Sequence, residues 1–340
     1  HWTNQGHQIS LSANSVSGFW ADTIDPNIDV VDLKVANFLA AVPSLRKALA
    51  QRAPDVILSA MTQANFTATK VGKLTGIPCV LSERHHTSTW MARLSPTKRF
   101  VYKALLPFLY SRADARIAQT AGAAQDLAEV AKLPTNAVDV IPNPISQPSE
   151  LSERAPHSWL TEIEIPVVVG VGRLVPQKDF ATLIRAIALL RKKKAVRLIL
   201  LGDGPLLPEL TQLARSEGVE NAVFFAGQVD NVQDHLARAK VYVLSSHFEG
   251  FPNAMLEALA MGVPVVSTDC PTGPRDILQD EKYGKLVPIG DPVVMADAIE
   301  QVIDHPHSPG TLRERAAEFD IGLVSNRYLD VLERAVGWVD

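Results

Sequence analysis

The chain has 340 residues, of which 46% are hydrophobic and 21% charged, and this composition excludes a disordered or fibrous protein. Its length favours two domains, because a single hydrophobic core rarely grows beyond about 250–300 residues. The formal net charge of -4 argues against a partner nucleic acid, since proteins that bind nucleic acid non-specifically are usually basic. No apolar run reaches the roughly 20 residues that cross a bilayer, so we expect no membrane-spanning helix.

The start of the chain and its cysteines give two further expectations. The chain begins at His1 without an initiator Met or a signal peptide, and Gly6 is typical of a residue that ends a helix. We therefore expect that part of the fold lies upstream. Cys79 and Cys270 match neither a disulfide framework nor a zinc pattern, so we expect buried thiols in a cytoplasmic protein.

Short apolar runs alternate with helical patterns along the first half of the chain. The runs predict strands over 9–13, 56–59, 78–82, 115–118 and 138–141, and the helical patterns include 37–51 and 64–75. Residues 142–150 are rich in proline and break every pattern. We therefore predict a first domain over 1–148 and a linker over 149–164.

The second half repeats this alternation. Strands are predicted over 167–171, 197–201, 223–226, 241–245 and 265–267, with helices between them such as 180–194 and 254–261. Residues 323–338 read as a final amphipathic helix. The pattern predicts an α/β fold of parallel sheets covered by helices on both faces, with a second domain over 165–320 and a last helical segment over 321–340.

Ligands of such sheets bind beyond the carboxyl ends of the strands, so the loops there are the candidate sites. After strand 167–171, Gly172 allows close backbone approach, and Arg173 and Lys178 add two cations before the next helix. These residues predict a clamp for a diphosphate, or else a tight turn with two solvated cations. The third glycine of the dinucleotide fingerprint is absent, which disfavours a dehydrogenase.

Two more loops of the second half are candidates. Gly202 and Gly204 could let the backbone approach a base or ribose, and the alternative is an ordinary turn with Asp203 as a cap. Glu249 and Glu257 flank a loop that opens a helix near Asn253, an arrangement that suits a ligand with hydroxyls at both ends and phosphates in the middle. The alternative is a loop charge and an exposed helix residue. Residues 269–277 follow another strand and could close the site.

In the first half, titratable side chains follow strand 78–82: Glu83, Arg84, His85 and His86. They could line an acceptor pocket. Adjacent histidines do not share a helix face and no third ligand has metal spacing, so we expect no metal.

Residues 97–112 combine Lys98, Arg99 and Lys103 with large apolar side chains. Such a helix either lies on anionic lipid or packs into the core with its cations solvated.

Taken together, these motifs resemble the family 4 retaining glycosyltransferases along essentially the whole chain. Glu249 and Glu257, with the loop between them, resemble the family's Glu-seven residues-Glu signature, and Gly172-Arg173 with Lys178 resembles its diphosphate loop. The resemblance implies the GT-B fold: two facing, doubly wound Rossmann-like domains with a C-terminal helix that crosses back to the first.

The resemblance also implies roles for individual residues. Arg173 and Lys178 would neutralise the leaving diphosphate, Glu257 would bind the ribose hydroxyls, and Glu249 would hold the donor sugar. The donor-side residues would be Gly172, Gly202, Asp203, Gly204, Gly227, Gln228, Val229, Gly250, Phe251, Pro252, Asn253, Ala254 and Glu257. No cofactor is implied beyond the donor, for which UDP is the usual nucleotide.

The acceptor would bind the first domain. Subgroups that elongate lipid-linked or capsular saccharides often carry Ser-Glu-Arg followed by Asn at the place of Ser82-Glu83-Arg84, where this chain has His85. The implied acceptor is a glycan or a polyprenyl-diphosphate-linked saccharide. Family members also begin with a strand, a Gly-rich loop and a helix that this chain mostly lacks, so its first sheet should have unpaired edges.

Two other functions stay open at this stage. The chain could bind nucleotide-sugars without transferring them, or it could be a sugar-nucleotide epimerase on the same fold.

Overall fold

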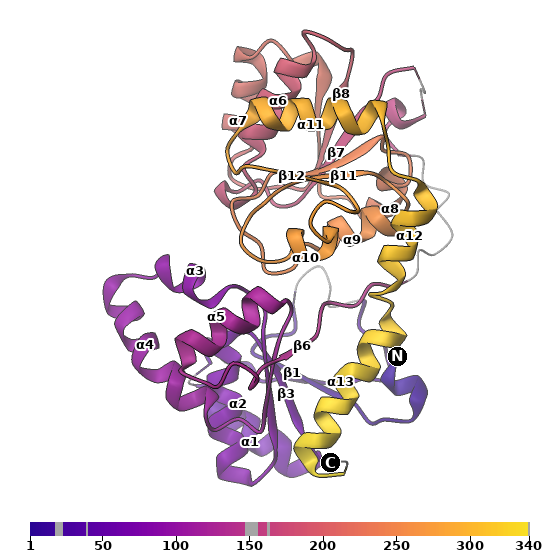
Figure 1. Cartoon of the computed structure of the whole chain (residues 1–340). Helices are drawn as coiled ribbons and strands as arrows, with labels where there is room; N and C mark the ends of the chain where they lie inside the picture. Colours follow the sequence, from indigo (N-terminus) through magenta and orange to yellow (C-terminus); the bar gives the residue numbers. More distant parts are fainter. Residues whose placement is uncertain (18–22, 39, 147–155, 162–163, 339–340) are drawn as a thin grey trace. The chain divides into compact units, whose positions relative to one another are not determined.

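The computed structural model describes residues 1–17, 23–38, 40–146, 156–161 and 164–338. Their contacts divide the chain into two compact units (Figure 1). The first unit comprises His1–Pro142 and Ile321–Asp340, and the second comprises Asn143–Asp320. Among the described residues, no helix has both the length and the apolar character needed to span a membrane.

The strands of the first unit form two parallel sheets. β1 (Ser10–Ala13) pairs with β2 (Asp29–Asp32), while β3 (Ile57–Ala60), β4 (Cys79–Glu83), β5 (Ala115–Ala118) and β6 (Asp139–Val140) form a separate sheet in that order. Within the described residues β3 pairs only with β4, and Leu58 on it is 36% exposed. β2 was not predicted.

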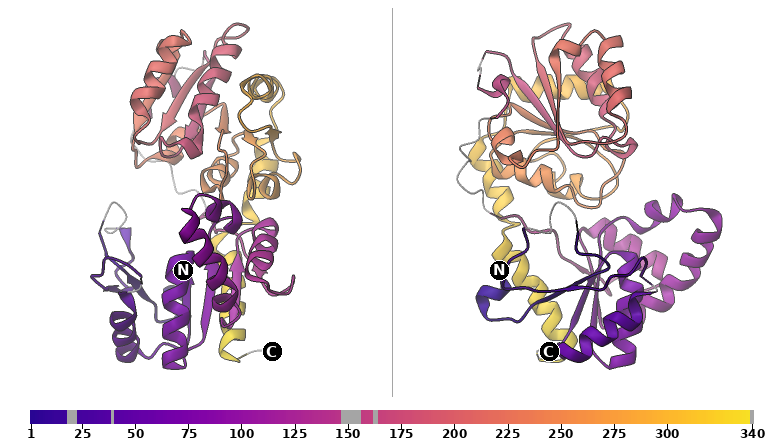
Figure 2. Two further views of the ribbon diagram at one scale, coloured as in Figure 1. Left: turned by 90° about the vertical axis from the view of Figure 1, so that its left-hand side faces the viewer. Right: turned by 180° about the vertical axis from the view of Figure 1, so that it is seen from behind.

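Helices pack around the four-stranded sheet (Figure 2). They are α1 (Ala41–Arg52), α2 (Thr62–Thr75), α3 (Thr87–Ala92), α4 (Pro96–Tyr110), α5 (Ala121–Ala131) and α13 (Ile321–Val336). The 3-10 helix η1 (Trp2–Gln5) ends at Gly6, whose φ of 92° is left-handed, as the sequence indicated. Leu106 and Leu109 of α4 join the core on one face of the sheet, and Val324 and Val331 of α13 pack on the other against Val80 and Ile117.

The second unit contains one six-stranded parallel sheet in the order β12-β11-β10-β7-β8-β9. Its strands are β7 (Val167–Val171), β8 (Arg197–Leu201), β9 (Val223–Gly227), β10 (Val241–Leu244), β11 (Val265–Thr268) and β12 (Lys285–Val287). They are rich in Val, Leu and Ile and mostly buried, as strands covered on both faces must be.

Each face of this sheet has its own hydrophobic core. One core includes residues of α6 (Phe180–Leu190), α7 (Leu207–Ser216) and α11 (Pro292–Asp304). The other includes residues of α8 (Val232–Leu236), α9 (Asn253–Ala260), α10 (Pro274–Leu278) and α12 (Pro309–Ala317). The described residues of this unit also include the short 3-10 helices η3 (Ser158–Leu160), η4 (Pro176–Lys178) and η5 (Glu220–Ala222). The α/β fold with doubly wound, Rossmann-like parallel sheets is therefore confirmed.

The structure divides the chain slightly before the predicted domain end at residue 148. Ile145 donates from its backbone N–H to the carbonyl of Phe319 at 2.8 Å and bridges to Asp320, which ties 143–146 to the second unit. Much of the predicted linker, 149–155 and 162–163, lies outside the described residues.

Candidate functional site

The strand order of the second sheet determines where its ligand loops meet. From β7 the chain winds outward to β8 and β9, then returns to the other side of β7 to form β10. The loops that follow β7 and β10 therefore leave the sheet in opposite directions, and such a switch point is where open α/β sheets bind ligands. Arg173 and Lys178 follow β7, and Glu249 and Glu257 follow β10.

Hydrogen bonds hold these two loops together. The Ser245 hydroxyl donates to the carbonyl of Lys178 at 2.7 Å. The backbone N–H of His247 donates to the carbonyl of Gln177 at 2.9 Å, and the Gln177 amide donates back to the carbonyl of Phe248 at 3.0 Å. Backbone of one loop is thus fixed to backbone of the other, so their side chains are presented as one surface.

Lys178 and Glu249 form an ion pair at the centre of this surface. The Nζ atom of Lys178 lies 2.7 Å from Oε1 of Glu249, with the two side chains 20% and 8% exposed. The Ser246 hydroxyl donates to the same Oε1 atom at 2.6 Å. A buried carboxylate needs such partners. Because both bonds end on Oε1, the other oxygen, Oε2, keeps its capacity to accept hydrogen bonds.

The rest of the β7 loop supports this pair. Gly172 has a φ of 152°, and a Cβ atom there would lie 2.7 Å from Cε of Lys178. Glycine therefore lets the Lys178 side chain lie across the backbone. Arg173 is exposed on the same loop, and no described residue forms a hydrogen bond or ion pair with its guanidinium. One cation of the predicted clamp is paired, and the other is available.

The β8 loop presses against the β7 loop. A Cβ atom on Gly202, at a φ of 132°, would lie 2.1 Å from the carbonyl oxygen of Gly172. Gly202 N–H donates to the carbonyl of Gly227 at 2.7 Å, and Leu174 N–H donates to the carbonyl of Asp203 at 2.9 Å. The Asp203 carboxylate accepts from the N–H of Gly204 at 2.7 Å, so Asp203 stabilises its own turn. Of the neighbouring predicted residues, Gln228 is exposed and Val229 packs against the core.

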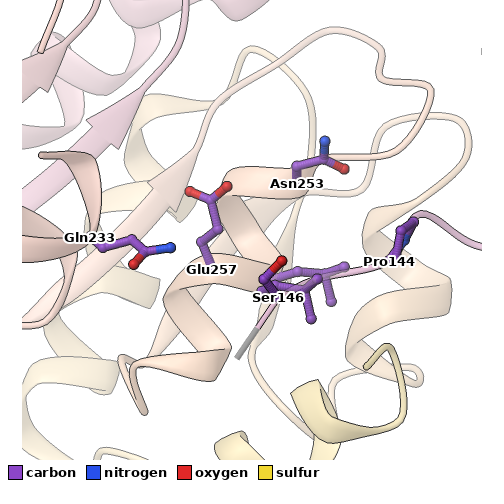
Figure 3. A pocket seen from close by; sticks show the side chains of 7 residues that line it. Pro144, Ser146, Gln233, Asn253 and Glu257 are labelled. Carbon is purple, nitrogen blue, oxygen red and sulfur yellow. The ribbon is translucent and has the colours of Figure 1, made fainter. Parts of the chain in front are cut away.

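Glu257 lines a pocket in the second unit (Figure 3). The pocket residues are Pro144, Ile145, Ser146, Gln233, Asn253, Leu256 and Glu257. Figure 3 shows the Glu257 carboxylate from α9 between the amides of Gln233 and Asn253. Burial raises the pKa of Glu257, and none of the described residues forms a hydrogen bond with its carboxylate. The arrangement can accept hydrogen bonds from ligand hydroxyls.

The residues between Glu249 and Glu257 differ in how far their side chains are exposed to a ligand. Phe251 and Pro252 are buried, and Phe251 packs against Phe319 with ring centroids 6.0 Å apart, so a ligand would meet only their backbone. Gly250 and Ala254 are half-buried, and Asn253 is exposed and accepts from the Asn143 amide at 2.8 Å. The loop after β11 reaches the same place, because the Thr272 hydroxyl donates to the carbonyl of Glu249 at 2.8 Å.

The acidic and basic cluster of the first unit is more buried than its sequence suggested. Glu83 is 1% exposed at the end of β4. Its carboxylate accepts from the hydroxyl groups of Tyr110 and Thr62, the latter at 3.0 Å, and lies 3.3 Å from Nδ1 of His85. Burial and the neighbouring Glu83 charge raise the pKa of Tyr110. Glu83 therefore organises the end of β4, and the 25% exposed side chain of His85 is the part that a ligand could reach.

The neighbouring residues are also engaged. Nδ1 of His86 lies 3.3 Å from the Asp126 carboxylate, and Arg84 is half-buried with a partner. Among the residues that the structure describes, no group of three or more His, Cys, Asp and Glu side chains could hold a metal ion.

Sequence reasoning missed Gln233 and Ser246 as parts of these sites. Ser246 directly follows a predicted strand, and that position could have indicated it. Nothing in the sequence indicated Gln233 as a site residue, because a single Gln on a short helix is common on any protein surface.

Both units match family models of glycosyltransferases. Residues 1–144 match the model described as "Glycosyl transferase 4-like domain", and residues 165–305 match "Glycosyl transferases group 1". One relative is the lipopolysaccharide core biosynthesis glycosyltransferase LpsE of Rhizobium meliloti, 40% identical over 177 residues, which are 51% of each chain.

A second relative comes from Campylobacter jejuni. It is N-acetylgalactosamine-N,N'-diacetylbacillosaminyl-diphospho-undecaprenol 4-alpha-N-acetylgalactosaminyltransferase, 30% identical over 60% of this chain and 54% of that protein. The matches thus span about half of the length of these two relatives. Among solved structures, Anabaena Alr3699/HepE in complex with UDP and glucose superimposes with a TM-score of 0.78 at 20% identity, covering 96% of this chain and 91% of that one. This last likeness concerns the fold alone.

Proposed function

The chain belongs to the group 1 glycosyltransferases, and from this membership we propose that it transfers a sugar from a nucleotide-sugar donor to a saccharide acceptor. The observation that carries the proposal is the Lys178–Glu249 pair, 2.7 Å apart at the switch point of the second sheet. In this proposal Lys178 would bind the diphosphate of the donor, and Glu249 beside it would accept hydrogen bonds from the hydroxyls of the sugar. The second unit is the donor side in this proposal.

Catalysis would be mainly electrostatic. When the bond between the sugar and the diphosphate breaks, negative charge grows on the diphosphate and positive charge on the sugar ring. Lys178 and the unpaired Arg173 would stabilise the first charge. Glu249 would accept hydrogen bonds from the sugar through Oε2 while Lys178 and Ser246 hold Oε1. We propose retention of the anomeric configuration, as the family resemblance implies.

We propose UDP as the nucleotide of the donor. Glu257 supports this side of the proposal, since a half-buried carboxylate beside Gln233 suits the paired hydroxyls of a ribose. A solved protein of the same fold is described in complex with UDP and glucose. No metal or other cofactor is required in this scheme, because Lys178 and Arg173 supply the positive charge.

For the acceptor we propose a glycan or a polyprenyl-diphosphate-linked saccharide bound by the first unit. The Campylobacter jejuni relative carries a diphospho-undecaprenol substrate in its name, and the Rhizobium meliloti relative is named for the lipopolysaccharide core. In the first unit, the half-buried His85 at the end of β4, with a side chain 25% exposed, is the first candidate for acceptor contact.

Calorimetric titration with UDP, GDP and a panel of UDP-sugars tests the donor. We expect UDP to bind and the double variant Arg173→Ala/Lys178→Ala to lose binding. Product analysis then tests the reaction: incubation with donor and acceptor should give a glycoside with the donor's anomeric configuration. An epimerised donor, formed without acceptor, would instead identify an epimerase, and binding with no turnover would identify a binding protein.

A further inference from the structure

Aromatic side chains from a loop and three helices meet at the carboxyl end of β4. The ring centroids of His85 and Trp90 lie 5.1 Å apart, those of Trp90 and Tyr102 4.9 Å, and those of Tyr102 and Phe66 5.5 Å. Trp90 belongs to α3, Tyr102 to α4 and Phe66 to α2. The Thr62 hydroxyl, one turn before Phe66 on α2, lies 3.2 Å from Nε2 of His85 and closes the circuit. We call the four rings the aromatic cluster.

The aromatic cluster combines accessible ring surface with unpaired polar atoms. All four residues are half-buried, so each keeps part of its surface open to a ligand. None of the described residues forms a hydrogen bond with the indole N–H of Trp90 or with the hydroxyl of Tyr102. Trp and Tyr side chains that pack against a core usually find a partner for these groups. The cluster can therefore stack on an apolar surface while it exchanges hydrogen bonds with polar groups at the edge of that surface.

The aromatic cluster borders the edge of the sheet at which ligands are expected. β3 and β4 end level with one another, because Ala60 is paired with Ser82 in their register. Thr62 follows the end of β3, and His85 follows the end of β4. Ligands of parallel α/β sheets bind beyond these carboxyl ends. The position of the cluster therefore fits a binding site of the first unit.

Met61 has a strained backbone at the same edge. Its φ of 79° and ψ of 137° lie in a region that residues other than glycine rarely adopt. The Met61 N–H donates to the carbonyl of Ser82 at 3.1 Å, and the Met61 carbonyl accepts from the N–H of Asn65 at 2.9 Å, so both neighbours hold this conformation. The Met61 side chain is 54% exposed. Such strain collects at functional sites, and Met61 adds an adaptable apolar side chain next to Thr62.

The charge beside the aromatic cluster indicates which part of a ligand binds there. The buried Glu83 carboxylate lies 3.3 Å from Nδ1 of His85 and accepts a hydrogen bond from Thr62 at 3.0 Å. A diphosphate over His85 would meet this carboxylate at low dielectric, where like charges repel strongly. A pyranose ring carries no charge and presents an apolar C–H face with hydroxyls around it. The cluster therefore suits a neutral sugar ring and disfavours a diphosphate.

We propose that the aromatic cluster binds the terminal sugar of the saccharide acceptor, which stacks its C–H face on Trp90 and exchanges a hydrogen bond with the hydroxyl of Tyr102. His85 and Met61 would flank this sugar. The inference rests on the proposed binding of the acceptor by the first unit, and it adds which part of the acceptor is bound and by which residues. The occupant is the saccharide and not a lipid that carries it.

Saturation-transfer difference NMR of the full chain, recorded without nucleotide, tests the proposal. The probes are the methyl glycosides of glucose, galactose, N-acetylglucosamine and N-acetylgalactosamine in both anomeric forms, and farnesyl diphosphate represents a lipid carrier. We expect saturation of the ring C–H protons of at least one glycoside, and a titration then gives its Kd. Because no nucleotide is present, the result depends neither on donor binding nor on transfer.

Variants of the cluster separate stacking from hydrogen bonding. Trp90→Leu keeps an apolar side chain against the core but removes the ring, and it should weaken glycoside binding about tenfold or more, since Trp is among the residues that dominate binding energies. Trp90→Phe keeps a ring and should restore most of this loss. Tyr102→Phe removes only a hydroxyl and should weaken binding about 2- to 10-fold.

Trp338→Leu is the matched control, because Trp338 belongs to the same unit, is 60% exposed and lies outside the cluster. It should bind the glycoside like the wild type. Thermal melting shows which variants fold, and Tyr102→Phe still tests the site if Trp90→Leu does not. The proposal is overturned if no glycoside is saturated, if Trp338→Leu loses as much binding as Trp90→Leu, if Tyr102→Phe binds like the wild type, or if only farnesyl diphosphate binds.

The same measurements separate this inference from the proposed function. UDP binding and sugar transfer that persist while no glycoside binds would overturn the acceptor site alone. Glycoside binding that depends on Trp90, in a chain that does not bind UDP, would support the saccharide site and contradict the proposed donor.

Discussion

Lys178 would perform two tasks in the proposed diphosphate site. In the absence of ligand it neutralises Glu249, from which it is 2.7 Å away, and so makes the burial of that carboxylate tolerable. With a diphosphate present, the same ammonium group would be shared between the ligand and Glu249. The neutral partner of Glu249, Ser246, would keep the carboxylate in place during this exchange.

Substituting Lys178→Gln should therefore weaken UDP binding by about 10- to 100-fold, because a hydrogen bond to a charged group contributes about 1.5–3 kcal/mol. Isothermal titration calorimetry measures the effect. Lys192→Gln, which removes an exposed cation on the same unit, is the control and should leave the Kd unchanged. Equal affinities of wild type and Lys178→Gln would rule out the diphosphate role.

Glu257 gives a prediction about stability and pH. Burial raises its pKa above the ordinary value of 4.5, so the folded chain binds this proton more tightly than the unfolded chain. The contribution of this group to stability then falls as pH rises through the interval above 4.5. Glu257→Gln removes the charge and should be more stable than the wild type at neutral pH, with the difference closing as the pH is lowered towards 4.5.

Urea denaturation of both proteins across this pH range measures the difference. Glu209→Gln, an exposed site on α7, should show no comparable gain. Glu257→Gln should at the same time bind UDP more weakly, because it loses a carboxylate that would accept hydrogen bonds from the ligand. A desolvated carboxylate in a binding site lowers the stability of the protein and serves the binding of the ligand. A Gln variant that is less stable than the wild type at neutral pH would contradict the argument.

The positions of individual residues in the loops after the strands were easier to predict than their contacts. Lys178 and Glu249 were each predicted from their loops, but 71 residues separate them, and only the strand order brings them together. Glu83 was expected at an acceptor surface. Its burial depends on Thr62 and Tyr110, which are 21 and 27 residues away and belong to α2 and α4. Such distant partners leave no local pattern in the sequence.

At the level of elements, the β7 and β8 loops hold each other in place through two glycines. The contact between Gly202 and the carbonyl of Gly172 leaves no room for any side chain, because a Cβ atom would approach the oxygen to 2.1 Å. Relief of that clash requires one loop to move, and the β7 loop carries Arg173 and Lys178. Packing between two loops therefore positions the cations of the site.

Gly202→Ala and Gly218→Ala form a matched pair for this argument. Both glycines have positive φ values, but nothing lies within 4 Å of a Cβ atom on Gly218. Gly218→Ala should lower the free energy of unfolding by about 1–2 kcal/mol from backbone strain alone. Gly202→Ala should lower it further and should also weaken UDP binding. Thermal denaturation and calorimetry distinguish the two variants, and identical losses of stability with unchanged UDP binding would disprove the coupling of the loops.

The strands that sequence reasoning found and missed differ in composition. β5, β7 and β8 have the predicted bounds, because β8 and β7 are nearly continuous runs of Val, Ile and Leu and β5 follows a clear turn. β2 contains two valines between aspartates and has at most intermediate burial, and β12 has three residues at a sheet edge. Such short or exposed strands depend on their neighbours for their pairing and lack a pattern of their own.

At the scale of the whole molecule, the chain returns at its end to the unit in which it began. α13 buries Val324 and Val331 against Val80 and Ile117 of β4 and β5, although more than 150 residues of the second unit lie between them in the sequence. Trp2 adds to the same region by donating its indole N–H to the carbonyl of Ser325 at 3.3 Å. The first unit therefore depends on the last helix for one of its cores, whereas the second unit is continuous in sequence.

This dependence predicts that the two units can be destabilised separately. Val324→Ala/Val331→Ala should lower the stability of the first unit by about 3–5 kcal/mol, because both valines are buried and each substitution leaves a cavity. Hydrogen exchange should become faster at the amides of β4 and β5 and remain unchanged at those of β7 and β8, while UDP still binds. Val293→Ala/Val294→Ala at exposed positions of α11 should change neither set of amides. Faster exchange throughout both units would instead mean that the chain unfolds as a single cooperative unit, with α13 supporting both cores.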